Sequence, residues 1–195
     1  MELEKLNVKF FMADSDRVPL TDFVEIFHRW IQATDGIYHD VGDYSHMQDG
    51  PGVVLVAREA NVSIDETGGR RGVLYAQKTP LPGTHQEKLR AACRAALESC
   101  RRLADEPALK GKLSFRLNEV EITVNDRLSA PNTKETFESL KPDLEAVAGR
   151  LFAQAALTCR HEEDSRQRFS VAFRAVDPPD LMTSLANLGA ETKSD

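Results

Sequence analysis

Histidine and aspartate side chains are concentrated in one short segment, Tyr38–Gly52, which reads YHDVGDYSHMQDGPG. Imidazole and carboxylate groups suit zinc, iron or manganese, so His39, Asp43 and His46 are candidate metal ligands. Their spacing matches no established motif, and the His-Glu-x-x-His metal motif does not occur. Three hypotheses stay open: a metal or acid–base site, a site for another ligand, or a polar loop closed by its Asp-Gly-Pro-Gly turn, whose aspartates accept backbone hydrogen bonds.

The same segment could also supply acid–base catalysis. Asp43 precedes His46 by three residues and could orient its imidazole, while Glu59 is the last residue of the next predicted strand and could approach from it. His46, Asp43 and Glu59 are therefore the catalytic candidates, since imidazole can act as ligand, acid, base or donor near neutral pH. No nucleophile or oxyanion donor accompanies them in the sequence. The competing hypothesis is that His46 caps the loop by bonding to the backbone.

A glycine-rich segment, Asp65–Gly72 (DETGGRRG), is the second place where a ligand could bind. It lacks the Lys-Ser/Thr pair of a P-loop and leads into a predicted strand rather than a helix. Gly68 and Gly69 suit the positive φ angles of a tight turn, which predicts a β-hairpin connection. Arg70 and Arg71 at its tip are candidate ligand-binding residues for a carboxylate or phosphate.

Apolar periodicity predicts the elements that position these residues. The predicted strands span residues 6–12, 53–59, 72–78 and 112–117, and the predicted helices between them span 20–32 and 85–106. This order is the βαββαβ arrangement of ferredoxin-like domains. The predicted fold class is therefore α+β: a ferredoxin-like βαββαβ sandwich with a C-terminal β-α-β-α extension.

One predicted strand carries an irregularity. Within residues 112–124 the apolar side chains occupy odd positions up to Leu117 and even positions from Val120 onward. Because side chains in a strand alternate with period two, this change of parity predicts a bulge or turn near Asn118 and Glu119.

The helical segments also yield specific expectations. On the long helix Leu97 lies in the apolar stripe and Arg94 lies beyond its edge. Cys93 and Cys100 share the apolar stripe and are expected to be small core residues. A later helix, over residues 132–156, is expected to break at Pro142.

The composition limits the class of protein. The chain has 195 residues, 41% of them hydrophobic, which suits one globular domain over 1–195, with 178–195 as a C-terminal helix and tail. A formal net charge of -6 disfavours nucleic-acid binding. No apolar run is long enough to span a membrane, and the first residues show no signal peptide, so a cytoplasmic location is expected.

Three segments, DVGDYSHMQDGPGVVLV, GGRRGVLYAQK and NDRLSAPNT, resemble a group of small uncharacterised bacterial proteins, over about residues 6–155. The resemblance implies a cytoplasmic bacterial protein and supplies no catalytic residues. Two functions are carried forward. The first is a domain that binds a small molecule or a protein partner, with a homo-oligomer as one form of it. The alternative is a small metal-assisted or acid–base enzyme that uses the His39–Asp49 loop. The sequence assigns no cofactor to either.

Overall fold

The computed structural model describes residues 2–13 and 18–189. Within these residues it is an α+β structure with one eight-stranded antiparallel sheet and four α-helices. The strands are β1 (Leu6–Met12), β2 (Tyr38–Asp43), β3 (Val53–Ala57), β4 (Ala60–Asp65), β5 (Gly72–Gln77), β6 (Phe115–Val124), β7 (Leu157–His161) and β8 (Phe169–Ala175). The helices are α1 (Leu20–Ala33), α2 (His85–Ala104), α3 (Lys134–Leu151) and α4 (Leu181–Gly189).

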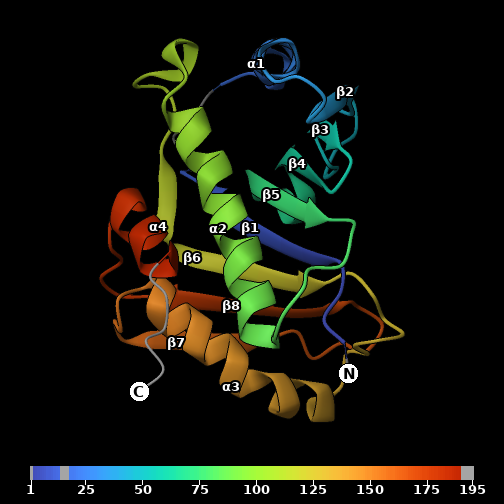
Figure 1. Cartoon of the computed structure of the whole chain (residues 1–195), viewed down its shortest axis with the longest axis vertical. Coiled ribbons are helices and arrows are strands. Elements are labelled where there is room, and N and C mark those ends of the chain that lie inside the picture. Colours follow the sequence, from blue (N-terminus) through green and yellow to red (C-terminus); the bar gives the residue numbers. More distant parts are fainter. Residues whose placement is uncertain (1, 14–17, 190–195) are drawn as a thin grey trace.

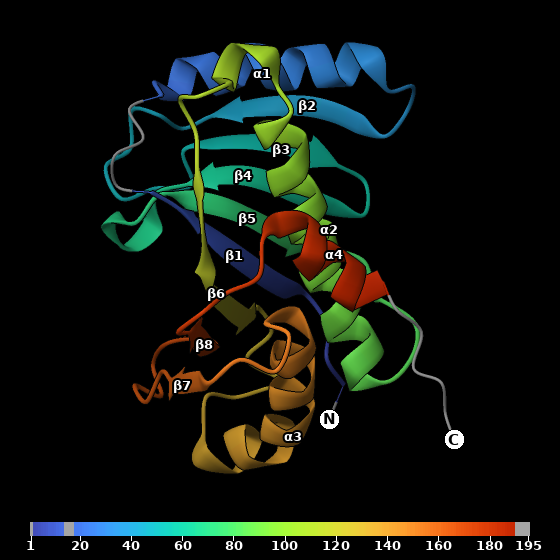
Figure 2. The same cartoon turned by 90° about the vertical axis from the view of Figure 1, so that its left-hand side faces the viewer.

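The strands follow the order β2-β3-β4-β5-β1-β6-β8-β7 across the sheet. The helices α2, α3 and α4 lie together on one side of the strands, and α1 lies along β2 at one end of the sheet (Figure 1, Figure 2). Helix α2 contacts β1 and β5, whereas α3 and α4 contact α2 and each other. No helix of the described residues has the length and apolar character needed to cross a bilayer.

The central strand β1 divides the molecule into two environments. Leu6, Val8 and Phe10 point toward the helices and belong to one contiguous hydrophobic core. Asn7 and Lys9 alternate with them and therefore point to the opposite face of the sheet. We call this opposite surface the open face, because the helices pack on the other side.

The bulge expected from the change of parity is confirmed. As β1 advances from Phe10 to Phe11, its partner on β6 jumps from Val120 to Arg116. The residues between these two partners form the irregularity, and β6 continues through it as one strand. Glu119 is one of these irregular residues, and it lies opposite Arg174 of β8, on the open face.

The sheet is more complex than the ferredoxin-like order with a C-terminal β-α-β-α extension that the sequence predicts, because three strands, β2, β4 and β7, were missed. Strand β2 arises from the first part of the segment expected to be a loop, and it is a half-exposed edge strand with little apolar content. Strand β4 follows β3 after only two residues, so no separate turn signal marked it. Strand β7 is the opposite edge of the sheet and carries exposed polar side chains.

The break expected at Pro142 was wrong. Helix α3 runs through this residue without interruption from Lys134 to Leu151. Pro142 is exposed, and so is Glu138, whose carbonyl loses its intrahelical partner, so water can bond to that carbonyl. The expected C-terminal tail, from residue 190 onward, lies outside the residues that the structure describes.

The thiols assigned to the core lie in the core. Cys93 and Cys100 are fully buried on α2, as Leu97 is. Burial raises the pKa of the Cys93 thiol to about 12 and raises that of Cys100 as well. Both side chains therefore behave as small protonated hydrophobic groups at neutral pH.

The helix face gives the first prediction. Leu97→Ala is expected to lower the free energy of unfolding by about 2–5 kcal/mol, because it leaves a cavity in the core. Arg94→Ala, on the exposed side of the same helix, is expected to cost about 0.5 kcal/mol or less. Urea denaturation of both variants measures the difference, and equal losses would contradict the assigned face.

Candidate functional site

The histidine and aspartate candidates lie at the surface beside strand β2. His39 and Asp43 belong to β2 itself, and His46 lies in the turn that follows, with all three exposed. Hydrogen bonds from the side chain and backbone of Ser45 hold the pKa of Asp43 below its usual value. The His46 ring makes no hydrogen bond to any described residue, so the structure gives no support for backbone capping by this ring.

The structure does not bring Glu59 to these residues. Asp43 pairs with Val53 at the start of β3, whereas Glu59 follows Ala57 at the end of that strand. At about 3.3 Å per residue, the strand places the backbones of Asp43 and Glu59 roughly 13 Å or more apart. Among residues 2–13 and 18–189, no group of three histidine, cysteine, aspartate or glutamate side chains is arranged to hold a metal ion. Metal binding at His39, Asp43 and His46 stays a prediction.

The rest of the Tyr38–Gly52 segment supports the neighbouring turn. The Asp49 carboxylate accepts a hydrogen bond from the Gly69 backbone at 3.0 Å, and the Gly50 carbonyl accepts one from the Glu66 amide at 3.0 Å. Gly52 has φ +62°, and a Cβ there would approach the Ile64 carbonyl oxygen to 2.1 Å. Only glycine fits this close backbone approach, which holds the turn against the end of β4.

The hairpin expected between Asp65 and Gly72 is confirmed. Strands β4 and β5 pair antiparallel, with Asp65 opposite Gly72. A short 3₁₀ turn connects them, and Gly68 and Gly69 adopt φ values of 77° and 65°. The segment therefore forms a strand connection without the helix N-terminus of a nucleotide loop.

The two arginines of this hairpin point to different partners. Arg71 bonds to Glu66 and to the Val18 carbonyl, and both contacts tie loops together. Arg70 instead donates two hydrogen bonds of 2.9 Å to Glu119, and its guanidinium stacks 3.7 Å above the Phe11 ring. Arg70 therefore lines the open face, whereas Arg71 does not.

The open face contains a hollow of about 880 Å³, which we call the sheet hollow. It extends from the β4–β5 turn, over β1, β6 and β8, to the β7–β8 turn. Its cationic side chains are Lys9, Arg70, Arg127, Arg160, Arg166 and Arg168, and its anionic side chains are Asp65, Glu121 and Glu162. The lining is thus predominantly cationic in a chain whose net charge is -6.

Cross-strand pairing places part of this lining in one row across the sheet. Lys9 lies opposite Glu121, and Glu121 lies opposite Ala172. Ala172 in turn lies opposite Arg160 on the edge strand β7. The small side chain of Ala172 leaves the floor of the hollow open between an acidic and a basic residue.

The neighbouring row is polar but uncharged. Asn7 lies opposite Thr123, which lies opposite Ser170, and the two hydroxyl groups bond to each other at 3.0 Å. Asn7 is only 9% exposed, and its Oδ1 atom is buried without a hydrogen-bond partner among the described residues. A buried acceptor without a partner costs free energy, so this atom is a locally unfavourable feature of the fold beneath the floor of the hollow.

Lys9 is held at one end of the floor by a buried ion pair. Its ammonium group lies 2.5 Å from the Asp65 carboxylate and 3.1 Å from the Thr67 carbonyl oxygen. The Lys9 and Asp65 side chains are only 6% and 5% exposed. Because a buried charge without a partner is strongly destabilising, each of these residues requires the other.

At the opposite end of the hollow, two guanidinium groups have no hydrogen-bond or ion-pair partner among the described residues, and we call them uncommitted. Arg160 and Arg168 make no hydrogen bond or ion pair with the residues that the structure describes. Arg166 pairs with Asp164, and Arg127 donates to the Ser165 carbonyl. Arg160 and Arg168 are therefore the lining cations with the most donor capacity left for a ligand.

Glu119 anchors the rim of the hollow near the bulge. It accepts hydrogen bonds from Arg70 and from Arg174, and its side chain is only 6% exposed. The hydrogen bonds from Arg70, reinforced by Arg174 and opposed by burial, lower the pKa of Glu119 to about 2. The carboxylate therefore stays ionised at any pH near neutrality.

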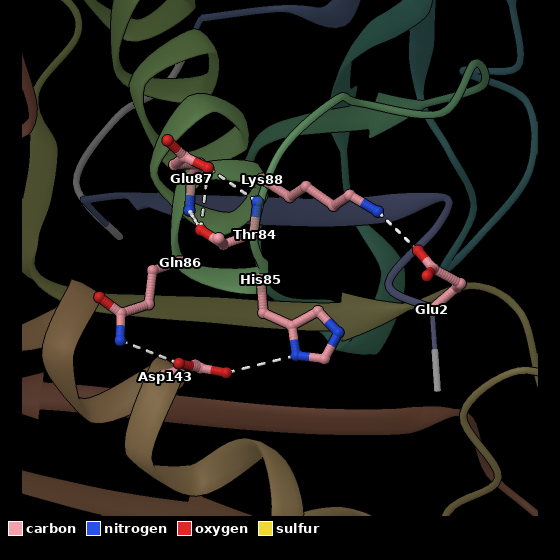
Figure 3. Close-up of polar contacts among 7 residues, drawn as sticks. All are labelled: Glu2, Thr84, His85, Gln86, Glu87, Lys88 and Asp143. Carbon is pink, nitrogen blue, oxygen red and sulfur yellow. Dashed lines mark hydrogen bonds and ion pairs between the residues drawn. The ribbon is translucent and has the colours of Figure 1, made fainter.

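A smaller hollow of about 580 Å³ lies at the start of α2 (Figure 3). The polar groups drawn there contact one another: His85 and Gln86 both reach Asp143 of α3, and Lys88 reaches Glu2. The Thr84 and Glu87 side chains close the helix N-terminus as a capping box. These contacts join α2 to α3 and to the N-terminal segment, so we assign the cluster a structural role.

Sequence reasoning missed most residues of the sheet hollow. Asn7 and Lys9 were visible as the polar half of an alternating strand, but such residues usually face water. Arg160 precedes and Arg168 ends a highly charged stretch, residues 161–168, whose composition is typical of a solvated loop. The signal available in the sequence was the excess of arginine at its two ends.

Comparisons of this chain with protein-family models, with curated proteins and with solved structures gave no match. The fold and the site by themselves define an α+β protein in which helices cover one face of the sheet and the other face carries a cationic hollow. What the hollow does must be argued from its own chemistry.

The Glu119 network gives a prediction with a defined pH dependence. The pKa of Glu119 is about 2 in the folded protein, whereas the ordinary pKa of a glutamate is near 4.5. The ionised Glu119 therefore makes its full contribution to the free energy of unfolding above pH 4.5. This contribution is lost as the pH falls from 4.5 toward 2. Glu119→Gln is expected to lower the free energy of unfolding at pH 7 by about 2–3 kcal/mol. The difference from wild type should narrow progressively in acid.

Urea denaturation at several pH values measures this difference. Glu138→Gln, which removes an exposed carboxylate on α3, is the matched control. A difference between wild type and Glu119→Gln that stays constant from pH 7 to pH 3 would contradict the assigned network.

The exposed position of His46 gives a separate prediction. His46→Ala is expected to change the free energy of unfolding by about 0.5 kcal/mol or less, because the ring has no hydrogen bond to lose. Metal analysis of wild type and variant, purified without chelators, tests the ligand hypothesis directly. A stoichiometric metal that disappears in the variant would establish His46 as a ligand.

Proposed function

We propose that this protein binds a small anionic molecule in the sheet hollow. The observation that carries the proposal is the concentration of cationic side chains in one hollow of an acidic chain. A cleft lined by one sign of charge attracts ligands of the opposite sign and raises their local concentration. This proposal specifies the first of the two functions expected from the sequence, a binding domain: the binding site is the sheet hollow, and the ligand is negatively charged.

The geometry of the lining supports a carboxylate or phosphate. The guanidinium groups of Arg160 and Arg168 have planar forks of donors that match either anion. They lie at the edge of the sheet, beside β7 and the β7–β8 turn, where a ligand can enter from solvent. The hydroxyl groups of Thr123 and Ser170 add neutral donors on the floor.

The size of the hollow supports a small molecule over a nucleic acid or a protein chain. Its volume of about 880 Å³ lies in the range of ligand clefts. Phosphate backbones would meet the acidic remainder of the surface. The metal-assisted or acid–base enzyme has no specific observation in its favour among the described residues.

We also propose that four of the strands form a ferredoxin-like unit to which the others are added. Strands β4, β5, β1 and β6 are adjacent in that order, which is the order a βαββαβ unit requires. Helices α1 and α2 occupy the matching places in the chain. Such a unit is a common scaffold, which by itself does not specify a function.

The proposal predicts the effect of removing the uncommitted arginines. Isothermal titration calorimetry with inorganic phosphate, pyrophosphate and citrate is expected to detect binding of at least one anion to the wild-type chain. The double variant Arg160→Gln/Arg168→Gln should weaken that binding by roughly tenfold or more, because each lost charge-assisted hydrogen bond is worth about 1.5–3 kcal/mol.

Arg58→Gln is the control, since Arg58 is exposed in the β3–β4 turn, outside the sheet hollow. All titrations are run at one ionic strength, because screening alone changes the affinity of anions. Equal affinity of the double variant and Arg58→Gln for every anion, or no binding to wild type at millimolar concentration, would contradict the proposed function.

A further inference from the structure

We infer that Asn132 is a positioning residue of the sheet hollow: its side chain fixes the β7–β8 turn, residues 162–168, against the rest of the protein. This inference rests on the proposed function, because the turn carries arginines of the site that receives the anion. The residues of this turn that line the hollow are Glu162, Arg166, Gln167 and Arg168. Whatever holds the turn therefore determines where these side chains meet a ligand.

The β7–β8 turn has no apolar anchor of its own. Its sequence is EEDSRQR, and every residue in it except Asp164 is exposed. Asp164 shapes the turn from within, because its carboxylate accepts a hydrogen bond from the Arg166 amide at 3.0 Å and its carbonyl accepts one from the Gln167 amide at 2.8 Å. Since none of its side chains is buried in the core, the position of the turn depends on polar contacts with other segments.

Two side chains bond to the turn from another segment of the described chain. Asn132 donates its Nδ2 to the Asp164 carbonyl at 2.9 Å, and Arg127 donates to the Ser165 carbonyl at 3.2 Å. Both donors belong to the segment between β6 and α3. Arg127 is exposed and itself lines the hollow, whereas Asn132 is only 4% exposed and does not line it. Asn132 therefore supplies the buried attachment of the turn.

Asn132 has a rigid base in the chain. Thr133, the next residue, is the N-cap of α3, and its side chain accepts a hydrogen bond from the Thr136 amide at 3.2 Å. Pro131, the residue before, has a φ angle fixed by its ring. The Asn132 backbone is thus placed by the start of a helix, and its side chain transmits that position to the turn.

His161 binds the other end of the Asn132 amide. The Asp164 carbonyl can only accept a hydrogen bond, so the amide nitrogen faces it and the amide oxygen faces His161. This oxygen lies 2.8 Å from Nε2 of His161, which must therefore be the donor, whether or not Nδ1 also carries a proton. The ring stacks on Phe137 of α3, with centroids 4.6 Å apart, and contacts Phe169 of β8. The amide is thus oriented by a ring that is itself packed in place.

The value of this attachment for binding is preorganisation. Arg168 ends the turn, and Arg160 immediately precedes His161 on β7. Without Asn132 the same arginines would be present, but the turn would occupy many positions in the free protein. A ligand would then have to order it on binding, and this loss of conformational entropy lowers affinity.

Hydrogen–deuterium exchange of the full chain tests the attachment without a ligand. Asn132→Ala is expected to make the amides of residues 163–168 exchange roughly tenfold faster than in wild type, because the turn loses its buried attachment. Asp143→Ala is the matched control, since it also removes two polar contacts, those with His85 and Gln86, but at the junction of α2 and α3 (Figure 3). It should leave exchange in the turn unchanged. Equal exchange of the turn in Asn132→Ala and wild type would overturn the inference.

A double-mutant cycle tests the effect on binding. Isothermal titration calorimetry uses whichever of inorganic phosphate, pyrophosphate and citrate binds wild type most tightly. Asn132→Ala should weaken this binding by roughly threefold to tenfold, and Asp143→Ala should not change it. In an Arg168→Gln background, Asn132→Ala should cause a further loss of about twofold or less, because the side chain that it positions is gone. The same loss in both backgrounds would show that Asn132 does not act through Arg168.

The outcomes separate this inference from the proposed function. Anion binding that Asn132→Ala leaves unchanged would overturn the inference while the proposed function stands. No binding of the three anions to wild type at millimolar concentration would overturn the proposed function and the role of Asn132 in it, and the exchange measurement would still decide whether Asn132 holds the turn. If Asn132→Ala fails to fold, Asn132→Asp replaces it. The aspartate keeps an acceptor for His161 and loses only the donor to Asp164, so the same results are expected.

Discussion

The central strand β1 has no solvent-exposed side, and the organisation of the molecule follows from this constraint. Toward the helices it presents Leu6, Val8 and Phe10, which join the hydrophobic core. Toward the open face it presents Asn7 and Lys9, which are polar and yet almost equally buried. A buried lysine needs an opposite charge, and Asp65 at the end of β4 supplies it. The polar side chains of β1 on the open face are therefore buried and need partners within the protein, unlike polar side chains that water can solvate.

The bulge in β6 completes this polar interior. It changes which side chains of β6 face the helices and which face the hollow, so that Val120 enters the core and Glu119 reaches the open face. There Glu119 fixes Arg70, whose guanidinium covers the Phe11 ring. The position of one irregularity in a strand thereby determines how one wall of the hollow is held.

The sequence predicted those parts of the structure that depend on local periodicity. The stripe containing Leu97 and the bulge beside Glu119 both follow from the spacing of apolar side chains within one element. The edge strands β2 and β7 were missed because half-exposed strands carry polar residues and look like loops. The hollow could not be predicted either, because it depends on long-range pairing that brings Asn7, Glu121 and Arg160 together. Single-sequence periodicity carries no information on which strands become neighbours.

The position of β1 in the sheet also constrains how the chain is made. Strands β2 to β5 follow one another in both chain order and sheet order, so each can pair with its predecessor as soon as it is synthesised. Strand β1 is synthesised before the other strands of the sheet. Its two neighbours come much later in the chain, since β5 begins at Gly72 and β6 ends only at Val124. Until both have left the ribosome, the apolar side of β1 lacks its partners and is available for wrong associations. The strand that organises the finished molecule is thus separated from its last pairing partner by more of the chain than any other strand of the sheet.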